Sequence, residues 1–507
     1  MYLLGYDIGS SSIKAALFDS ATGQSVGLAQ HPRQEMAISA PQEGWAEQDP
    51  EMWWKHLCLA TRELLQQTQV DPQRIAGIGI AYQMHGLVLV DAQQKVLRPS
   101  IIWCDSRAVE IGRSAFQALG EQNCLRQLLN SPGNFTASKL KWVKDNEPEI
   151  YERIDKIMLP GDYIAMRLSG AICTTITGLS EGMFWDFEKE QLSELIMDHY
   201  GLEASHIPEL RPALGLQGQL TEAAAAQTGL RLGTPICYRA GDQPNNALSL
   251  GVLHPGEVAA TGGTSGVVYG LVDQPTYDPR SRVNGFAHIN HQPGLPRIGI
   301  LLCINGAGSQ YRWVKQNMSR EGLSYDDLEG QLATIPVGAE GLRMLPFGNG
   351  AERMLEDRAL GAQINNLQFN RHGQPHCYRA ALEGIAFSFV YGMQIMQQMG
   401  LNLEVMRVGN DNLFRSSTFA TTIASLLGSR IEMMATTGAL GAARAAGVAV
   451  GIYNTIEEAT QNNQLDTTYW PAASTQHYQA AYDSWLEDLH HILNHSIASQ
   501  YLKPGSI

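Results

Sequence analysis

Residues 5–19 read GYDIGSSSIKAALFD, in which a short apolar run containing Asp7 crosses three serines and resumes with apolar residues. The pattern predicts two antiparallel strands joined by a tight turn. Residues 260–273, ATGGTSGVVYGLVD, repeat this design about half a chain later. The matching positions are Gly9 with Gly263, Ser11 with Ser265, Ile13 with Val267, and Asp19 with Asp273. The repetition predicts an α/β chain of two duplicated domains, each containing one such hairpin.

The length of the chain agrees with this division. A chain of 507 residues is too long for one ordinary hydrophobic core, so two domains are expected. The position of the second hairpin places the boundary near residue 250, with a first domain at 1–250 and a second at 251–507. The last helix, expected from about residue 476 to 491, is left free to pack back on the first domain.

The charge and the cysteines exclude several classes of protein. The net charge of −14 argues against a nucleic-acid partner, although local charge can still favour a phosphorylated ligand. The seven cysteines contain no C-x-x-C pair and are expected to be reduced thiols of a cytoplasmic protein. The apolar stretch 438–453 contains Arg444 and is too short to cross a bilayer, so no membrane partner is expected.

The two hairpins suggest a site for phosphate. A hydroxyl-rich turn presents backbone N–H groups and side-chain oxygens that suit phosphate oxygens, and Asp7 could hold a hydrated Mg²⁺ that bridges phosphates. A simple Gly/Ser turn is the alternative for either copy alone, and the second copy favours the phosphate interpretation. The chain has no P-loop and no G-x-G-x-x-G match, so a nucleotide would bind between the hairpins. The candidate nucleotide-binding residues there are Ser11, Ser12, Lys14, Gly263, Thr264 and Ser265.

The segment YRAGDQPNNALSLG at 238–251 offers a candidate catalytic base. Asp242 follows an apolar strand and precedes an Ala/Leu-rich helix. An acid at the carboxyl end of such a strand faces the crevice where ligands bind, and a carboxylate there can accept a proton from a hydroxyl group. The alternative is a helix cap, for which Asp is a favoured residue. The residues alone support the two roles about equally.

Several stretches resemble the FGGY family of carbohydrate kinases, which shares the fold of actin and Hsp70. FTASKLKWVKDN at 135–146 resembles the first signature of that family, and the segment 361–384 resembles its second signature, with departures at Asn366 and Cys377. GWAEQDPEMWW (44–54), LPGDYIAMRLSG (159–170) and ALGAARAAG (439–447) are also similar to family segments. The resemblance spans nearly the whole chain and implies two ribonuclease-H-like domains with a cleft between them.

The resemblance also implies roles for particular residues. It gives Asp242 the role of general base and places Met84, His85, Trp103 and Asp105 at the sugar, because QMHG (83–86) and WCDSRA (103–108) are most similar to the xylulokinase members. Gln243 could bond a sugar hydroxyl, and the alternative is that it caps the helix or faces water. For adenine it implies Gly409 and Asn410, although the family usually has three glycines where this chain has Gly409, Asn410 and Asp411. Without the resemblance, His85 reads as a structural or exposed histidine, Asp105 as a turn residue paired with Arg107, and Asn410 as part of a turn.

The expected function is ATP-dependent transfer of a phosphoryl group to a pentulose, with ATP and Mg²⁺ as the cofactors and D-xylulose as the sugar. The GDQ of 241–243 is more similar to glycerol kinases, so ribulose, sedoheptulose and polyols stay open as substrates. An actin- or Hsp70-like ATPase without sugar chemistry is the second class, and the sugar-domain stretches count against it. The expected partners are a small sugar and ATP, and a homodimer is left open as the assembly.

Overall fold

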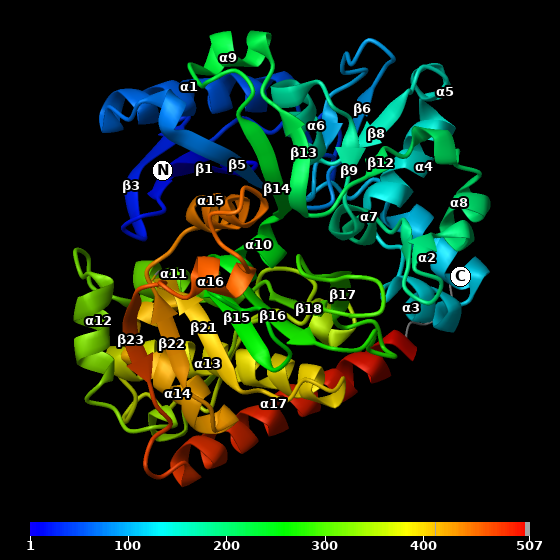
Figure 1. Cartoon of the computed structure of the whole chain (residues 1–507). Coiled ribbons are helices and arrows are strands. Elements are labelled where there is room, and N and C mark those ends of the chain that lie inside the picture. The colour runs from blue at the N-terminus through cyan, green and yellow to red at the C-terminus, as the bar shows by residue number, and fades with distance from the viewer. Residues whose placement is uncertain (411, 502–507) are drawn as a thin grey trace.

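The computed structural model describes residues 1–410 and 412–501 and contains two large mixed sheets (Figure 1). The six-stranded sheet has the order β13-β14-β5-β1-β2-β3. Its strands are β1 (Tyr2–Ile8), β2 (Ile13–Asp19), β3 (Gln24–His31), β5 (Ile75–Tyr82), β13 (Leu214–Gln219) and β14 (Pro235–Gly241). The seven-stranded sheet has the order β17-β18-β16-β15-β21-β22-β23. Its strands are β15 (Glu257–Gly262), β16 (Gly266–Val272), β17 (Asn284–Ala287), β18 (Ile298–Ile304), β21 (Val405–Gly409), β22 (Ile431–Met434) and β23 (Leu465–Tyr469).

The two sheets repeat one pattern of strand directions. In the first, β1 pairs antiparallel with β2 and parallel with β5, and β5 pairs parallel with β14. In the second, β15 pairs antiparallel with β16 and parallel with β21, and β21 pairs parallel with β22. An antiparallel edge strand, β13 or β23, completes each series. The structure therefore confirms the expected α/β fold with a duplicated architecture.

Helices cover both sheets and fill the space between them (Figure 1). They are α1 (Pro50–Thr68), α2 (Val109–Leu119), α3 (Glu121–Leu128), α4 (Thr136–Asn146), α5 (Pro148–Tyr151), α6 (Pro160–Ser169), α7 (Ile176–Glu181), α8 (Glu194–Tyr200), α9 (Glu222–Thr228), α10 (Asp242–Ser249), α11 (Ala307–Met318), α12 (Tyr325–Leu332), α13 (Gln374–Gln398), α14 (Ser417–Leu427), α15 (Gly438–Ala449), α16 (Ile456–Thr460) and α17 (Gln476–Tyr501). Short strands form two-stranded sheets between the helices: β4 (Glu47–Gln48) with β7 (Ser100–Ile101), β6 (Val88–Val90) with β8 (Lys156–Met158), β9 (Cys173–Thr174) with β12 (Glu209–Leu210), β10 (Trp185–Asp186) with β11 (Gln191–Leu192), and β19 (Arg343–Leu345) with β20 (Gln363–Asn365). Within the described ranges, no helix combines the length and the apolar character that crossing a bilayer would require.

Helix α15 crosses from the second half of the chain to the first sheet. It packs on β1 and β5, where two glycines allow the backbones to approach closely. A Cβ atom on Gly5 would lie 1.8 Å from the Ala439 carbonyl oxygen, and one on Gly79 would lie 1.9 Å from the Ala442 carbonyl oxygen. The small residues of α15 and these glycines therefore bring the start of the helix, at Gly438, to the carboxyl ends of β1 and β14.

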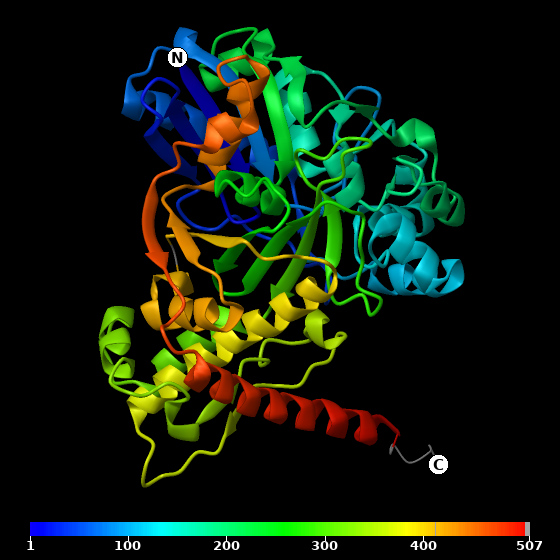
Figure 2. The same cartoon turned by 60° about the horizontal axis from the view of Figure 1, so that its bottom comes forward.

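The last helix, α17, packs on the second half of the chain. It lies on α13, α14 and β19, below the second sheet (Figure 2). Its buried Trp485 donates a hydrogen bond from Nε1 to the Met344 carbonyl oxygen at 3.0 Å. Packing of this helix on the first domain had been left open, and these contacts are with elements of the second half. The segment that returns to the first sheet is α15.

Candidate active site

The first hairpin forms the turn that its serines predict. The Gly9 N–H donates to the Ser12 carbonyl oxygen at 3.1 Å, and Ser11 lies exposed at the tip. Asp7 and Lys14 are directly paired across the hairpin, and the Lys14 Nζ lies 3.9 Å from the Asp7 Oδ2. Burial raises the pKa of Asp7, while the positive charge of Lys14 opposes this shift. The hairpin thus presents one carboxylate beside a turn rich in N–H and hydroxyl groups.

Asp242 lies close to this carboxylate. Strand β14 ends at Gly241, and α10 begins at Asp242. Burial raises the pKa of Asp242 to about 7, the negative charge of Asp7 adds to the increase, and hydrogen bonds from Gln243 oppose it. Gly241 occupies the N-cap position with no side-chain capping bond, so Asp242 is the first helical residue rather than the cap. The carboxyl group of Asp242 therefore titrates in the range that suits a general base near neutral pH.

Two helix starts meet at these acids. A Cβ atom on Gly438, the first residue of α15, would lie 3.1 Å from the Asp7 Oδ2. Asn245 on α10 donates from Nδ2 to the Gly438 carbonyl oxygen at 2.9 Å, which fixes the two helices together. The N-terminus of a helix carries partial positive charge and free N–H groups, which favour phosphate. The arrangement can thus hold phosphate groups between Asp7, Asp242 and α15.

The side chains at this place fit a hydrated Mg²⁺ better than a fully protein-ligated ion. Among residues 1–410 and 412–501, no group of three or more His, Cys, Asp or Glu side chains could hold a metal ion. Mg²⁺ usually keeps several waters and binds through one or two carboxylates together with substrate phosphates. Asp7 is a partly exposed carboxylate that matches this mode.

The second hairpin forms one wall of a pocket of about 460 Å³, which Gly262, Gly263 and Thr264 line. Helix α11 supports its turn, because the N–H groups of Gly308 and Ser309 donate to the carbonyl oxygens of Gly263 and Thr264 at 3.1 and 3.0 Å. Ser265 lies exposed at the tip of this turn. The remaining wall comes from α11, α12 and the start of α14, with the polar and aromatic residues Tyr311, Arg312, Tyr325, Asp326, Glu329, Arg415 and Ser416. The volume and the aromatic rings suit a nucleoside.

The predicted adenine residues Gly409 and Asn410 lie at the carboxyl end of β21, an interior strand of the second sheet, and are not among the residues that line the 460 Å³ pocket. Gly409 ends β21, and Asn410 donates from Nδ2 to the Asp466 carboxylate. Asp411 lies outside the described residues. Tyr311, Arg312 and Arg415 were not expected at the site, because they stand in ordinary helical or turn segments whose spacing carries no motif.

The predicted sugar residues Met84 and His85 follow β5. His85 has a positive φ of 61°, and its Nδ1 lies 3.0 Å from the Glu181 carbonyl oxygen. Burial lowers the pKa of His85 to about 3, so the ring is neutral, Nδ1 donates to this carbonyl and Nε2 is an acceptor. The ring packs on Phe135 at 4.7 Å and on Phe286 of β17 at 5.5 Å. A backbone conformation of this kind is common at functional sites.

Met84 connects this segment to the candidate base. A Cβ atom on Gly241 would lie 2.5 Å from the Met84 Cγ and 2.6 Å from the Glu181 Oε2. Glu181 is buried, and burial together with the charges of Asp242 and Asp162 raises its pKa well above the usual value. Glu181 was not expected at the site, because a single acid at the end of a short helix carries no sequence signal.

Trp103 and Asp105 differ in what they can contact. The Trp103 side chain is 53% exposed, and its Nε1 donates to the Ser10 Oγ at 3.3 Å, beside the first hairpin. Asp105 is fully buried and accepts from the Ala46 N–H at 2.6 Å and from the Arg107 Nη2 at 2.7 Å. The structure therefore gives Asp105 the ion pair with Arg107 that was its structural alternative, and leaves Trp103 open to the cleft.

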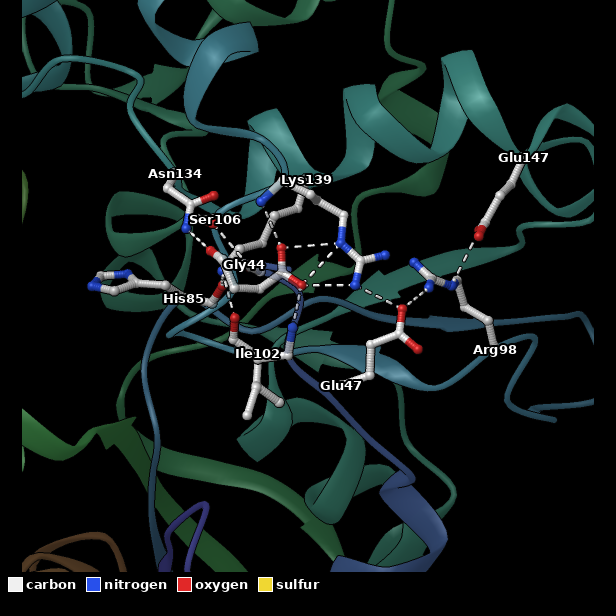
Figure 3. Close-up of polar contacts among 12 residues, drawn as sticks. Gly44, Glu47, His85, Arg98, Ile102, Ser106, Asn134, Lys139 and Glu147 are labelled. Atoms are coloured by element: carbon white, nitrogen blue, oxygen red, sulfur yellow. Dashed lines mark hydrogen bonds and ion pairs between the residues drawn. The ribbon is translucent and has the colours of Figure 1, made fainter. Parts of the chain in front are cut away.

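Lys139 joins the His85 segment to the Trp103 segment (Figure 3). Its buried Nζ donates to the carbonyl oxygens of His85 at 2.8 Å and Ile102 at 3.0 Å. Burial lowers the pKa of Lys139 to about 7, while the Asp105 carboxylate favours the charged form. The network continues through Arg107, Glu47, Arg98 and Glu147. Lys139 thus fixes the backbone of two segments that carry candidate sugar-binding residues.

Comparison with known proteins gives consistent matches over most of the chain. Residues 2–249 match the N-terminal domain of the FGGY family of carbohydrate kinases, and residues 258–450 match its C-terminal domain. The chain is 29% identical to a xylulose kinase of Escherichia coli (strain K12), over 95% of this chain and 96% of that protein. It is also 29% identical to an L-xylulose/3-keto-L-gulonate kinase of the same strain, over 96% of both. The solved xylulose kinase of Rhodospirillum rubrum is similar with a TM-score of 0.87 and 25% identity, over 97% of this chain and 100% of that one.

Proposed function

Because the chain belongs to the FGGY family of carbohydrate kinases, we propose that it transfers the γ-phosphoryl group of ATP to O5 of D-xylulose. The chain is an ATP-dependent sugar kinase. Beyond this, we propose which sugar it phosphorylates and which residues take part. The main support for the proposal is that Asp7 and Asp242 lie close together at the starts of α10 and α15, and that Met84 and His85 lie beside them. D-xylulose is favoured because relatives of nearly equal length are xylulose kinases.

In the proposed reaction, Asp242 accepts the proton of the attacking sugar hydroxyl. The new bond joins the sugar oxygen to the γ-phosphorus, the bond from the γ-phosphorus to the β–γ bridging oxygen breaks, and ADP leaves. Mg²⁺ bound through Asp7 would neutralise charge on the phosphates. The turns of the two hairpins and the start of α15 hold the phosphates in line with the hydroxyl, because positioning supplies most of the rate in phosphoryl transfer.

The sugar would lie against Met84 and His85. The free Nε2 of the neutral His85 ring accepts a hydrogen bond from a sugar hydroxyl, and Met84 provides an apolar wall beside it. Gln243 is placed next to the base and donates to it, so it orients the Asp242 carboxylate. Lys139 is a positioning residue, since it acts on the sugar only through the backbone of the His85 and Trp103 segments.

Other acceptors remain as the second candidates. The GDQ sequence at 241–243 is more similar to that of glycerol kinases, and one relative is named for L-xylulose and 3-keto-L-gulonate. An ATPase without sugar transfer would need no residues at the sugar position. The neutral His85, with a free ring nitrogen between Phe135 and Phe286, favours an acceptor molecule over simple hydrolysis.

The test is an ADP-release assay over a panel of ketoses and polyols. D-xylulose is expected to exceed glycerol in kcat/KM by a factor on the order of 10² or more, because a site built for several hydroxyls is left with unpaired polar groups by a smaller ligand. Equal kcat/KM values for the two would reject the pentulose and retain the sugar-kinase class. ADP release at the same rate without any acceptor would reject sugar transfer.

A variant of His85 tests the specificity further. His85→Ala is expected to reduce kcat/KM for D-xylulose much more than for glycerol, because only the larger sugar reaches the ring. His199→Ala, an exposed histidine on α8, is the matched control and should leave both values unchanged. Equal losses for the two substrates in the His85 variant would show that the ring does not select the sugar.

A further inference from the structure

A second pocket, of about 740 Å³, lies between the two halves of the chain and shares no lining residue with the pocket beside the second hairpin. Its walls come from the start of α7, the segment 210–214, the loop between β17 and β18, and α16. The proposed reaction uses none of these segments. A volume of this size is in the range of small-molecule sites.

The lining combines apolar side chains with two arginines, and its one acid, Glu457, lies 3.9 Å from the His254 Nε2. Leu214, Ile289 and Ile456 provide apolar surface, and Arg211 and Arg297 provide guanidinium groups. The half-buried Arg297 donates from Nη1 to the Pro296 carbonyl oxygen at 2.8 Å, and among the described residues it forms no ion pair with a carboxylate. Arg211 pairs with Glu209 at 2.9 Å, but both side chains are largely exposed, so little energy is needed to turn Arg211 to another anion. In a chain of net charge −14, two such cations in one pocket mark a place for an anionic group.

The loop that lines this pocket has unsatisfied polar atoms. Asn290 uses Nδ2 to donate to the Leu253 carbonyl oxygen, and its buried Oδ1 has no hydrogen-bond partner among the described residues. The His291 Nδ1 accepts from the Arg297 N–H, and its buried Nε2 likewise has no partner there. Buried polar groups in native structures are nearly always paired. A rearrangement of the loop around a ligand would give these two buried atoms hydrogen-bond partners.

Two elements connect the pocket to the sugar position. Helix α7 begins in the pocket with Ile176 and ends at Glu181, whose carbonyl oxygen holds the His85 ring. Strand β17 carries Phe286, which packs on the same ring, and continues directly into the loop that lines the pocket. The two elements are joined, because the Ala287 N–H donates to the Ser180 Oγ at 2.8 Å. A change at the loop or at the start of α7 is thus transmitted to His85 over one helix or one strand.

We propose that this pocket is a second ligand site, for a small sugar phosphate. Arg211 and Arg297 bind the phosphate group, because guanidinium groups match its geometry through paired hydrogen bonds. The carbon body lies on the apolar surface. Occupation of the site changes the affinity for the substrate sugar through α7 and β17, and this second part rests on the proposed role of His85.

Calorimetric titration of the full chain with glucose 6-phosphate and with inorganic phosphate tests binding independently of kinase activity. One site for glucose 6-phosphate is expected, with an affinity at least tenfold lower in Arg211→Ala and in Arg297→Ala. Arg297→Lys should fall between them and the wild type, because it keeps the charge and loses the paired geometry. Arg113→Ala on α2, an exposed arginine paired with Glu110, is the matched control and should bind as the wild type does.

Three results would overturn the proposal: no binding of glucose 6-phosphate at millimolar concentration, equal affinity for inorganic phosphate, or binding that the Arg211 and Arg297 variants leave unchanged. Thermal melting of each variant separates lost binding from lost folding. The titration measures binding at this pocket, so its result does not depend on whether D-xylulose is the substrate.

A separate measurement tests whether this pocket is coupled to the sugar site. The sugar KM should change at least threefold when glucose 6-phosphate is added to the wild type or to Arg113→Ala, and should stay constant in Arg297→Ala. An unchanged sugar KM in the wild type would reject coupling through α7 and β17.

Discussion

The two hairpins share a design and differ in charge. In the first, four residues separate β1 from β2, and Asp7 is paired with Lys14 across the strands. In the second, three residues separate β15 from β16, and the position that matches Asp7 is Thr261, paired with the apolar Val267. The turn that presents N–H groups is kept in both copies, while the carboxylate and the amine occur in the first alone.

This difference indicates a division of labour. The first hairpin lies beside Asp242 and the start of α15, where a charged phosphate and its metal ion would need a carboxylate. The second hairpin contributes the uncharged residues Gly262, Gly263 and Thr264 to the lining of the 460 Å³ pocket, which is the proposed place of the nucleoside. In the proposed function both turns would contact the phosphates, and the carboxylate chemistry would belong to the first.

The largest effect is expected at the base. Asp242→Asn should lower kcat by a factor on the order of 10²–10⁴, because a positioned base is lost while the similar shape keeps the sugar bound. Steady-state kinetics and sugar titration measure the two quantities. Asp49→Asn, which changes the cap of α1, is the matched control with unchanged kcat. Near-normal turnover in Asp242→Asn would reduce Asp242 to a structural residue at the start of α10.

The next effect separates the two hairpins directly. Asp7→Asn should lower kcat by a factor on the order of 10² and raise the Mg²⁺ concentration needed for half-maximal rate, because the carboxylate near the phosphates is lost. Thr261→Val, at the matching position of the second hairpin, should change kcat only a few-fold. Equal losses in the two variants would contradict the division of labour between the hairpins.

A smaller effect is expected at Lys139. Lys139→Met should raise the sugar KM about tenfold and leave the ATP KM unchanged, because two carbonyl oxygens of the sugar-binding segments lose their donor. Lys139→Arg should recover part of the affinity, and Lys141→Met, on the exposed face of α4, should behave as the wild type does. A variant that loses sugar and ATP affinity together would indicate general damage to the fold.

The smallest effect is the pH dependence. Because burial and Asp7 raise the pKa of Asp242 to about 7, the base is protonated below this pH, and kcat/KM should fall about tenfold from pH 8 to pH 6. Removal of the Asp7 charge in Asp7→Asn should move the profile to lower pH, since the repulsion that raised the pKa is gone. If the midpoint of the pH profile is the same in this variant as in the wild type, the two carboxylates do not interact.

The hairpins, the place of Asp242 between a strand and a helix and the duplicated fold were predictable, because turn residues and alternating apolar residues are local signals. Asp242 follows β14 and stands at the start of α10, as predicted. The pairing of Asp105 with Arg107 is local and was anticipated, but the contact of Asp105 with the Ala46 N–H and the two carbonyl contacts of Lys139 were not predictable, since each depends on segments far apart in the chain. The same holds for Tyr311 and Glu181, which reach their sites only through the packing of α11 and α7.

The most direct test is a crystal structure with D-xylulose, Mg²⁺ and a non-hydrolysable ATP analogue. We expect O5 of the sugar within about 2.6–3.2 Å of a carboxylate oxygen of Asp242, with the sugar against Met84 and His85 and a hydrated metal ion beside Asp7. The triphosphate should contact both turns. A sugar bound away from Asp242, or a metal ion held at the second hairpin instead of the first, would contradict it.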